Sequence, residues 1–308
     1  MGARSHRTIQ TQGAAIRITE SGSGEPACVF LHYWGGSGRT WDDVIDRIDG
    51  RVRCVAVDQR GWGDSIATDG RYDLAAMADD VQGVTLALGL QRYVLVGHSM
   101  CGKVAQIVAA RRPASLLGLV LVAPAPPTPM PVLEAQRGAM LASYGSREGV
   151  PQALMVLAGS PLTEDSRERV IEDTLRGAPR AKREWTERGM IEDVSSGLDA
   201  IIIPTIIVIG DRDRVEHESA LRQAFGRFVP HASFRSHRPD ARRFEPCFAR
   251  VTQFSGTGDG AVGDVSRGLC RHQAVARPQG HPFSGSLRHG LTAGGAVGRS
   301  RRKIMKRW

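Results

Sequence analysis

Cysteine is scarce in this sequence of 308 residues, and the cysteines form no pattern that predicts a disulfide framework or a metal site. There are five of them, irregularly spaced, with no C-x-x-C pair and no Cys/His cluster. Secreted disulfide scaffolds and structural zinc sites both depend on regular cysteine spacing. We therefore expect reduced thiols, a cytoplasmic protein and no metal site.

Long apolar runs are also missing. The opening segment 1–13 is polar and lacks the apolar core of a signal peptide, and the longest apolar run, 201–209, is interrupted by Pro204. A membrane-spanning helix needs about 20 consecutive apolar residues. The sequence therefore predicts no membrane segment.

Acidic residues are depleted in one part of the chain only. Residues 235–308 contain 15 Lys and Arg against 4 Asp and Glu, which leaves 26 against 28 in residues 1–234. The same stretch is rich in Gly and Arg and keeps no helical or strand periodicity. We interpret 236–308 as an atypical basic tail. Because its basic and aromatic residues form no interleaved pattern and no recognisable module, we do not expect it to bind nucleic acid.

Apolar patterns with strand and helix periodicity alternate in the first part of the chain. The expected strands are 8–13, 15–19, 27–31, 52–57, 93–96 and 116–122, and the expected helices are 40–48, 74–88 and 103–111. Such alternation predicts an α/β fold with a mostly parallel central sheet and helices on both faces.

The alternation stops at Pro124 and resumes about 75 residues later. Residues 130–197 have helical patterns with scattered methionines, which is typical of a substrate-covering cap. A helical layer without a role in substrate binding is the alternative. The predicted division is a first core segment 1–124, a helical cap 125–200, a second core segment 201–235 and the tail 236–308.

The stretch 93–112 carries the most specific local signal. It contains a short buried strand, then Gly97-His98-Ser99-Met100-Cys101-Gly102, then an amphipathic helix. A serine at the apex of a sharp turn between a strand and a helix is the arrangement of a nucleophile elbow. The first N–H groups of the helix would face charge that develops on a bound substrate.

Two other interpretations fit the same stretch. Gly97 to Lys103 resembles a phosphate-binding loop, but that loop needs Ser or Thr after the lysine, and Val104 stands there. Alternatively, Ser99 is a helix cap without a chemical role.

The order of motifs along the chain resembles the α/β-hydrolase superfamily over about residues 8–235. The motifs are Phe30-Leu31-His32-Tyr33-Trp34-Gly35-Gly36, Asp58-Gln59-Arg60-Gly61-Trp62-Gly63-Asp64-Ser65, Gly97-His98-Ser99-Met100 and Gly210-Asp211-Arg212-Asp213. Each motif is weak alone, but four in the family's order, each following an expected strand, are a specific combination. In this family the nucleophile, the acid and the histidine follow one another along the chain.

The resemblance assigns a catalytic triad. Ser99 is the expected nucleophile and Asp213 the expected acid, with Asp211 and Glu216 as weaker candidates for the acid. A serine hydroxyl needs a histidine to remove its proton, and the histidine needs a carboxylate to fix its tautomer. The alternative for Asp213 is a cap of the helix that follows.

The resemblance also assigns an oxyanion hole and neighbouring side chains. The backbone N–H groups of Trp34 and Met100 are the expected donors. His32, Tyr33 and His98 flank the expected site, and we assign them to substrate binding or to support of the site. Tyr33 stands where the family usually has glycine.

The histidine is where the sequence departs from the family, which has Pro-Gly-x-Gly-His after the last strand. Here His237 is the candidate in the nearest position, at the end of that strand; His231 precedes it, and His272, His281 and His289 lie in the tail. The composition changes at the same point, which suggests out-of-frame translation beyond residue 235. A Gly-x-Gly-His ending in another reading frame of the gene would support that hypothesis, and its absence would reject it.

These observations predict a serine hydrolase that cleaves a small carboxylic ester or lactone through an acyl-enzyme, with no metal or organic cofactor. A serine at the elbow argues against the dehalogenase and epoxide-hydrolase branches, which use aspartate. Perhydrolase or haloperoxidase-like activity and C–C bond hydrolysis use the same triad and remain open. A catalytically impaired α/β-hydrolase scaffold that lacks its histidine is the alternative from another class.

Overall fold

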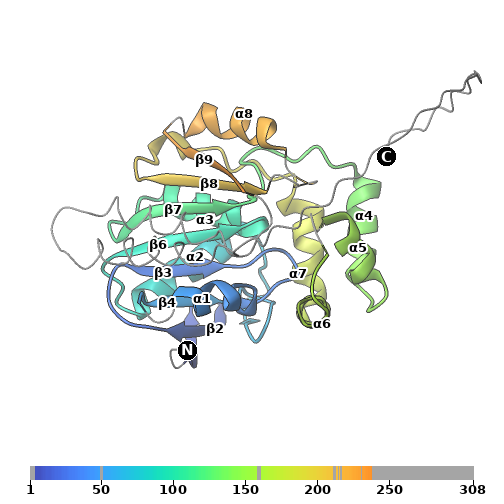
Figure 1. Ribbon diagram of the computed structural model, residues 1–308, viewed down its shortest axis with the longest axis horizontal. Helices are drawn as coiled ribbons and strands as arrows, with labels where there is room; N and C mark the ends of the chain where they lie inside the picture. Colours follow the sequence, from blue (N-terminus) through green and yellow to red (C-terminus); the bar gives the residue numbers. More distant parts are fainter. Residues whose placement is uncertain are drawn as a thin grey trace, which may run out of the picture. The chain divides into compact units, whose positions relative to one another are not determined.

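A central β-sheet organises the computed structural model of this protein (Figure 1). The structure describes residues 4–48, 51–157, 161–210, 213, 215, 217–229 and 231–237, with the backbone alone at 156 and 235–237. The tail predicted for 236–308 therefore lies outside the described residues except for the end of the last strand.

The described strands are β1 (Arg4–Thr11), β2 (Ala14–Ser21), β3 (Ala27–Leu31), β4 (Cys54–Val57), β5 (Ile66–Ala67), β6 (Tyr93–His98), β7 (Leu116–Val122), β8 (Thr205–Gly210) and β9 (Ser233–His237). The described helices are α1 (Asp42–Ile48), α2 (Leu74–Ala87), α3 (Met100–Ala110), α4 (Glu134–Ser143), α5 (Gly149–Leu157), α6 (Glu164–Arg176), α7 (Pro179–Glu184) and α8 (Glu218–Phe228). Short 3₁₀ turns occupy Gly38–Trp41 (η1) and Leu198–Ala200 (η3), and a π-helical turn (η2, Trp185–Gly189) follows α7.

The strands lie in the order β1-β2-β4-β3-β6-β7-β8-β9, and β5 pairs with β2. From β4 to β9 every neighbouring pair is parallel, whereas β1, β2 and β5 join in antiparallel fashion. All residues of β3 and β4 are buried, as expected for parallel strands covered on both faces. The predicted α/β fold with a mostly parallel sheet is confirmed.

Helices cover both faces of this sheet. On one face α2, α3 and α8 pack through residues such as Met77, Val104 and Phe225 onto alternate strand residues. On the other face η1 and α1 pack Trp41 and Ile45 onto the intervening strand residues. Since side chains alternate across a strand, the two apolar clusters share the same strands without sharing residues.

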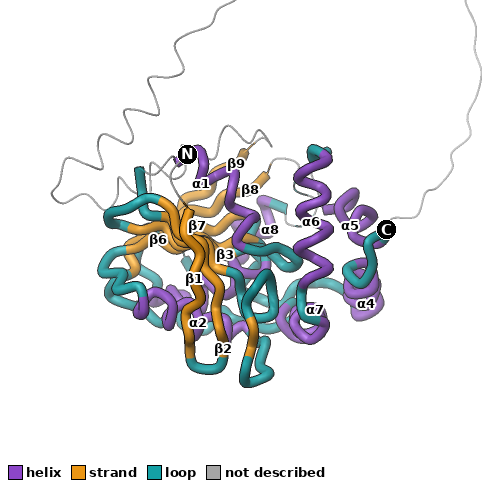
Figure 2. Tube along the Cα trace, turned by 90° about the horizontal axis from the view of Figure 1, so that it is seen from below, coloured by secondary structure: helices purple, strands orange, loops and turns teal. Residues whose placement is uncertain are grey.

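The four helices α4–α7 lie between β7 and β8 in sequence and are grouped beside one end of the sheet in both views (Figures 1 and 2). We call residues 134–189 the helical insertion. The hydroxyl of Thr174 donates to the carbonyl of Gly35 at 3.1 Å, and the N–H of Ala178 donates to the carbonyl of Gly61 at 2.8 Å. The insertion thus contacts the loops that follow β3 and β4, at the carboxyl ends of the parallel strands.

The expected and observed elements differ mainly in where they begin and end. The expected helix at 40–48 divides into η1 and α1, and Ser37 caps η1. Helix α3 begins at Met100 rather than Lys103, and β8 begins after Pro204, which cannot donate a ladder hydrogen bond. Among the described helices, none combines the length and the apolar character that a membrane crossing requires.

Candidate active site

Ser99 is the one residue between strand β6 and helix α3, and its backbone is in an uncommon conformation. Its φ is 51° and its ψ is −116°, a region that costs a non-glycine residue about 1–3 kcal/mol. The N–H of Ser99 donates to Val122 at 3.0 Å, and its carbonyl accepts from Gly102 at 2.8 Å and Ala125 at 3.0 Å. The surrounding backbone therefore holds the serine in the sharp turn that a nucleophile elbow requires.

The small residues around Ser99 are required by close packing. A Cβ on Gly97 would lie 2.4 Å from the carbonyl oxygen of Cys101, and one on Gly102 would lie 2.6 Å from the Cβ of Pro124. Both distances are shorter than nonbonded heavy atoms tolerate. These two glycines let strand β6, helix α3 and the segment after β7 converge on the serine.

Both rival interpretations of this stretch fail in the structure. The side chain of Ser99 makes no capping hydrogen bond to helix α3. Lys103 is fully buried. Its ammonium donates to the carbonyl of Gly189, the last residue of the helical insertion, at 3.2 Å, and to the carbonyl of Glu192, which follows the insertion. A lysine used in this way is not available to a phosphate group.

The two expected oxyanion donors follow neighbouring strands. Leu31 at the end of β3 pairs in register with Gly97 of β6, so Trp34 and Met100 each come three residues after one paired position. In the part of the chain that the structure describes, neither backbone N–H donates a hydrogen bond. Two unused N–H groups beside a serine are the feature that stabilises a developing oxyanion.

The fully buried imidazole of His32 joins two loops. Its Nδ1–H donates to the carbonyl of Tyr33 at 2.7 Å, and its Nε2 accepts the N–H of Gln59 at 3.0 Å. Burial lowers the pKa of His32, which keeps the ring in this neutral form. Because the Tyr33 carbonyl and the Trp34 N–H belong to one peptide group, His32 fixes the direction of that N–H. Of the two roles expected for His32, these contacts favour support of the site.

Tyr33 and His98 lie together and are partly buried. Their rings meet edge to face with centroids 5.2 Å apart, and His98 also contacts Trp41 at 6.1 Å. Burial, with a smaller effect of His32, lowers the pKa of His98 to about 4, so the imidazole is neutral at physiological pH. Burial raises the pKa of Tyr33, which keeps its phenol protonated. A role of these two side chains in substrate binding stays a prediction.

Asp213 follows strand β8 by three residues. Its N–H donates to the carbonyl of Gly210 at 3.1 Å, and its carboxylate accepts the N–H of Val215 at 2.8 Å. Helix α8 begins at Glu218 with His217 at the cap position, so Asp213 does not cap that helix. The weaker candidates for the acid, Asp211 and Glu216, lie outside the described residues.

His237 is the last residue of strand β9, and its backbone pairs in register with Gly210 of β8. The side chain of His237 lies outside the described part, as do His272, His281 and His289. His231 precedes β9, and its Nε2 lies 3.1 Å from the carbonyl of Ile203, which precedes β8. His231 is therefore at the amino ends of these strands, the opposite edge from Ser99.

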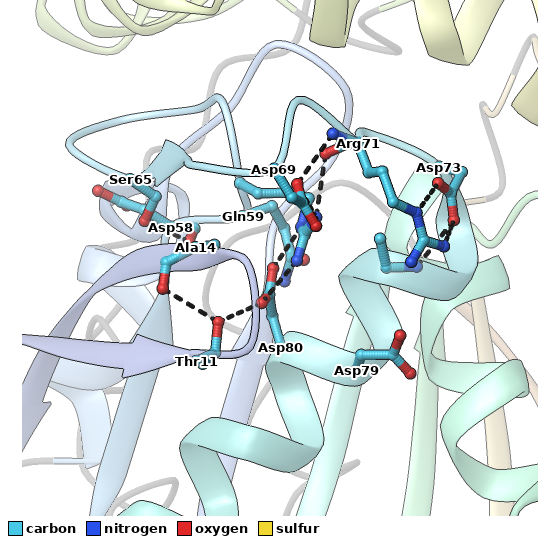
Figure 3. Close-up of polar contacts among 12 residues, drawn as sticks. Thr11, Ala14, Asp58, Gln59, Ser65, Asp69, Arg71, Asp73, Asp79 and Asp80 are labelled. Carbon is cyan, nitrogen blue, oxygen red and sulfur yellow. Dashed lines mark hydrogen bonds and ion pairs between the residues drawn. The ribbon is translucent and has the colours of Figure 1, made fainter.

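The second glycine-rich motif, 58–65, builds a support for the site (Figure 3). The carboxylate of Asp58 accepts N–H groups from Gly38 at 2.6 Å and Asp64 at 2.9 Å, which closes the loop after β4 against the loop after β3. Arg60, almost fully buried, pairs with Asp80 of helix α2 through Nε at 2.6 Å and Nη2 at 2.9 Å. No sequence pattern indicated a role for Asp80, because Asp80 lies in helix α2 and its partner Arg60 lies in the motif 58–65.

The sequence also gave no signal for the contacts between the helical insertion and the loop after β3. The indole ring of Trp34 stacks on Tyr144 with centroids 3.8 Å apart and an interplanar angle of 14°. The hydroxyl of Thr174 bonds to Gly35 across a separation of 139 positions. Contacts over such separations depend on tertiary structure and leave no local periodicity.

Comparisons with known proteins agree with this geometry. Residues 26–170 match the family described as alpha/beta hydrolase fold. The chain is 25% identical over 225 residues to 2-(acetamidomethylene)succinate hydrolase from Mesorhizobium japonicum, covering 70% of this chain and 81% of that one. It is 42% identical over 100 residues to the sn-1-specific diacylglycerol lipase ABHD11 of Mus musculus, but that match spans only 32% of each protein. The solved structure of carboxylesterase CesB from Bacillus subtilis has a TM-score of 0.71 at 18% identity and covers 83% of this chain and 93% of its own.

Strand order, elbow and helical insertion together define the α/β-hydrolase fold. The chain has this fold, and residues 26–170 are similar to the family of that name.

Proposed function

We propose that this protein is a serine hydrolase that cleaves a small carboxylic ester or lactone through an acyl-enzyme, without a metal or organic cofactor. The observation that carries the proposal is the constrained Ser99, whose side chain caps no helix, beside the unused N–H groups of Trp34 and Met100. A nucleophile and two oxyanion donors at one point are what acyl transfer requires.

The reaction would begin with attack of the Ser99 Oγ on the substrate carbonyl carbon. The hydroxyl proton passes to His237, and the carbonyl oxygen becomes an oxyanion that the N–H groups of Trp34 and Met100 stabilise. The bond to the leaving alcohol then breaks, and the histidine returns the proton to that alcohol. A water molecule attacks the acyl-enzyme by the same sequence of steps and releases the acid and the free serine.

Asp213 is the proposed partner of the histidine. The register between Gly210 and His237 supports this pairing, because Asp213 follows Gly210 by three residues while β9 ends at His237. A carboxylate there would hold the imidazole in one tautomer and stabilise its protonated form. Tyr33 and His98 are the proposed substrate contacts.

The test is hydrolysis of p-nitrophenyl acetate by the full chain and by the variants Ser99→Ala and His237→Ala. We expect each variant to lower kcat by at least about 10³-fold, since removing one member of a triad disables the group as a unit. Loss with Ser99→Ala alone would keep the nucleophile and reject His237 as the base. A folded parent without turnover would overturn the proposal and favour the impaired scaffold.

A further inference from the structure

The loop between β3 and η1, residues 32–38, carries the proposed oxyanion donor of Trp34 and is held from two sides. On the side of the core, His32 bonds to the carbonyl of Tyr33, and the N–H of Gly38 bonds to Asp58 at 2.6 Å. These contacts fix the two ends of the loop. The middle of the loop, where Trp34 and Gly35 lie, is held by the helical insertion.

Three contacts make up the attachment to the insertion. The carbonyl of Gly35 accepts the hydroxyl of Thr174 at 3.1 Å, in a buried position. The hydroxyl of Ser37 donates to the carboxylate of Asp173 at 2.8 Å. The indole of Trp34 stacks on the phenol ring of Tyr144, as described above. Hydrogen bonds to residues 35 and 37 and a ring contact at residue 34 leave this segment little freedom.

Two of the three contact residues of the insertion, Asp173 and Tyr144, have further partners. Asp173 is 3% exposed and pairs with Arg39, whose Nε lies 3.1 Å from the carboxylate. The carbonyl of Tyr144 accepts the ammonium of the buried Lys182 at 3.1 Å. Positions held in this way transmit a displacement of the insertion to the loop, because packed interiors deform little.

Gly35 shows how closely the two parts fit. Its φ is +97°, and a Cβ there would lie 2.5 Å from Cε1 of Tyr144 and 3.0 Å from Oγ1 of Thr174. A side chain at residue 35 would therefore push the insertion away from the loop. The left-handed conformation of Gly35 turns the chain between the indole of Trp34, which stacks on Tyr144, and the carbonyl of Gly35, which accepts the hydroxyl of Thr174.

We propose that Thr174, Asp173 and Tyr144 of the helical insertion are positioning residues for the Trp34 oxyanion donor. The insertion then acts on the chemical step itself, in addition to any role in covering a substrate. This inference rests on the proposed function. An oxyanion donor contributes only when its N–H points at the place where the charge develops, and removing one donor costs about 10²–10³-fold in kcat. A displaced donor therefore lowers kcat more than it changes KM.

The test compares Thr174→Val, Thr174→Ser and Thr186→Val in the full chain. Valine keeps the shape of threonine and removes the hydroxyl, and serine keeps the hydroxyl. Thr186 is a matched control, because it is a buried threonine of the insertion whose hydroxyl bonds to the carbonyl of Arg183 at 3.1 Å within its own helical segment. The readouts are amide hydrogen exchange of peptides that cover 32–38 and the kcat and KM for p-nitrophenyl acetate.

We expect Thr174→Val to speed exchange in 32–38 and to lower kcat by about 10-fold, with KM within about 2-fold of the parent. Thr174→Ser should recover most of kcat, and Thr186→Val should match the parent in both readouts. Asp173→Asn keeps the size of the side chain and should likewise lower kcat with little change in KM. This variant replaces Thr174→Val in the test if Thr174→Val does not fold.

The inference is overturned if Thr174→Val equals Thr186→Val in kcat, whether or not exchange of the loop changes. It is also overturned if exchange in 32–38 does not respond to Thr174→Val, a result that needs no turnover. Failure of the proposed function has a different signature: the parent does not hydrolyse the ester, or Ser99→Ala retains the activity.

Discussion

Replacing Asp80 by alanine tests the buried ion pair that supports the loop after β4 (Figure 3). The Asp80 carboxylate is 1% exposed and accepts two hydrogen bonds from Arg60 and one from Thr11. Alanine removes all three hydrogen bonds and leaves the buried guanidinium of Arg60 with Asp69, at 3.1 Å, and a backbone carbonyl as its remaining partners. The substitution therefore leaves the buried positive charge of Arg60 without its main partner, which differs from the loss of a surface contact.

The magnitude follows from the partners that remain. Stranding one member of a buried pair costs about 3–5 kcal/mol, and we expect the lower end of about 3 kcal/mol because Asp69 still contacts Arg60. The higher helix propensity of alanine within α2 offsets a few tenths of a kcal/mol. With a urea dependence of about 2.5 kcal/mol per molar, the midpoint of unfolding should fall by about 1 M.

Urea unfolding followed by circular dichroism measures this change. Arg71→Ala is the control, because Arg71 pairs with Asp73 nearby but is 54% exposed, and its midpoint should equal that of the parent. Arg60→Met combined with Asp80→Leu should recover much of the loss, since neither charge then remains buried. A midpoint for Asp80→Ala equal to that of Arg71→Ala would refute the reasoning.

Two further predictions concern the site. Ser99→Gly should be about 1 kcal/mol more stable than Ser99→Ala in urea unfolding, because glycine relieves the φ of 51° at a smaller cost in backbone entropy; equal stability would mean that the elbow stores no strain. The midpoint of unfolding should fall between pH 7.5 and pH 5, because burial lowers the pKa of His98 to about 4 while the unfolded chain takes up the proton near pH 6.5. The His98→Phe variant should show a smaller fall over the same range, and an equal fall in both proteins would contradict the assignment.

The sequence predicted those parts of the fold that local periodicity determines. The bounds of β3 and β7 were as expected because each is a continuous buried run between turn residues. The start of α3 was placed three residues late, because Met100 and Cys101 belong to the helix only once the backbone of Ser99 has turned. The two-residue strand β5 carries too little pattern to be recognised.

The residues of the candidate site fall into two groups in the same way: those that a motif within one loop indicates, and those whose role depends on tertiary contacts. Ser99, Trp34 and Met100 were assigned from motifs within single loops, and the strand register places those loops side by side. The sequence left two roles open for His32, because the choice depends on Gln59, a residue of another loop whose N–H donates to the second ring nitrogen. The contacts of Thr174 and Asp173 join residues more than a hundred positions apart, which no pattern within one sequence can indicate.

The stack of Trp34 on Tyr144 has a consequence for protein engineering. Exchanging the helices between β7 and β8 for those of a relative is an obvious way to alter the substrate range. In this protein such a chimera would also replace the ring and the hydroxyl on which residues 34 and 35 rest. Selectivity and turnover would then change together, so a graft should carry the matching segment 32–39 along with the helices.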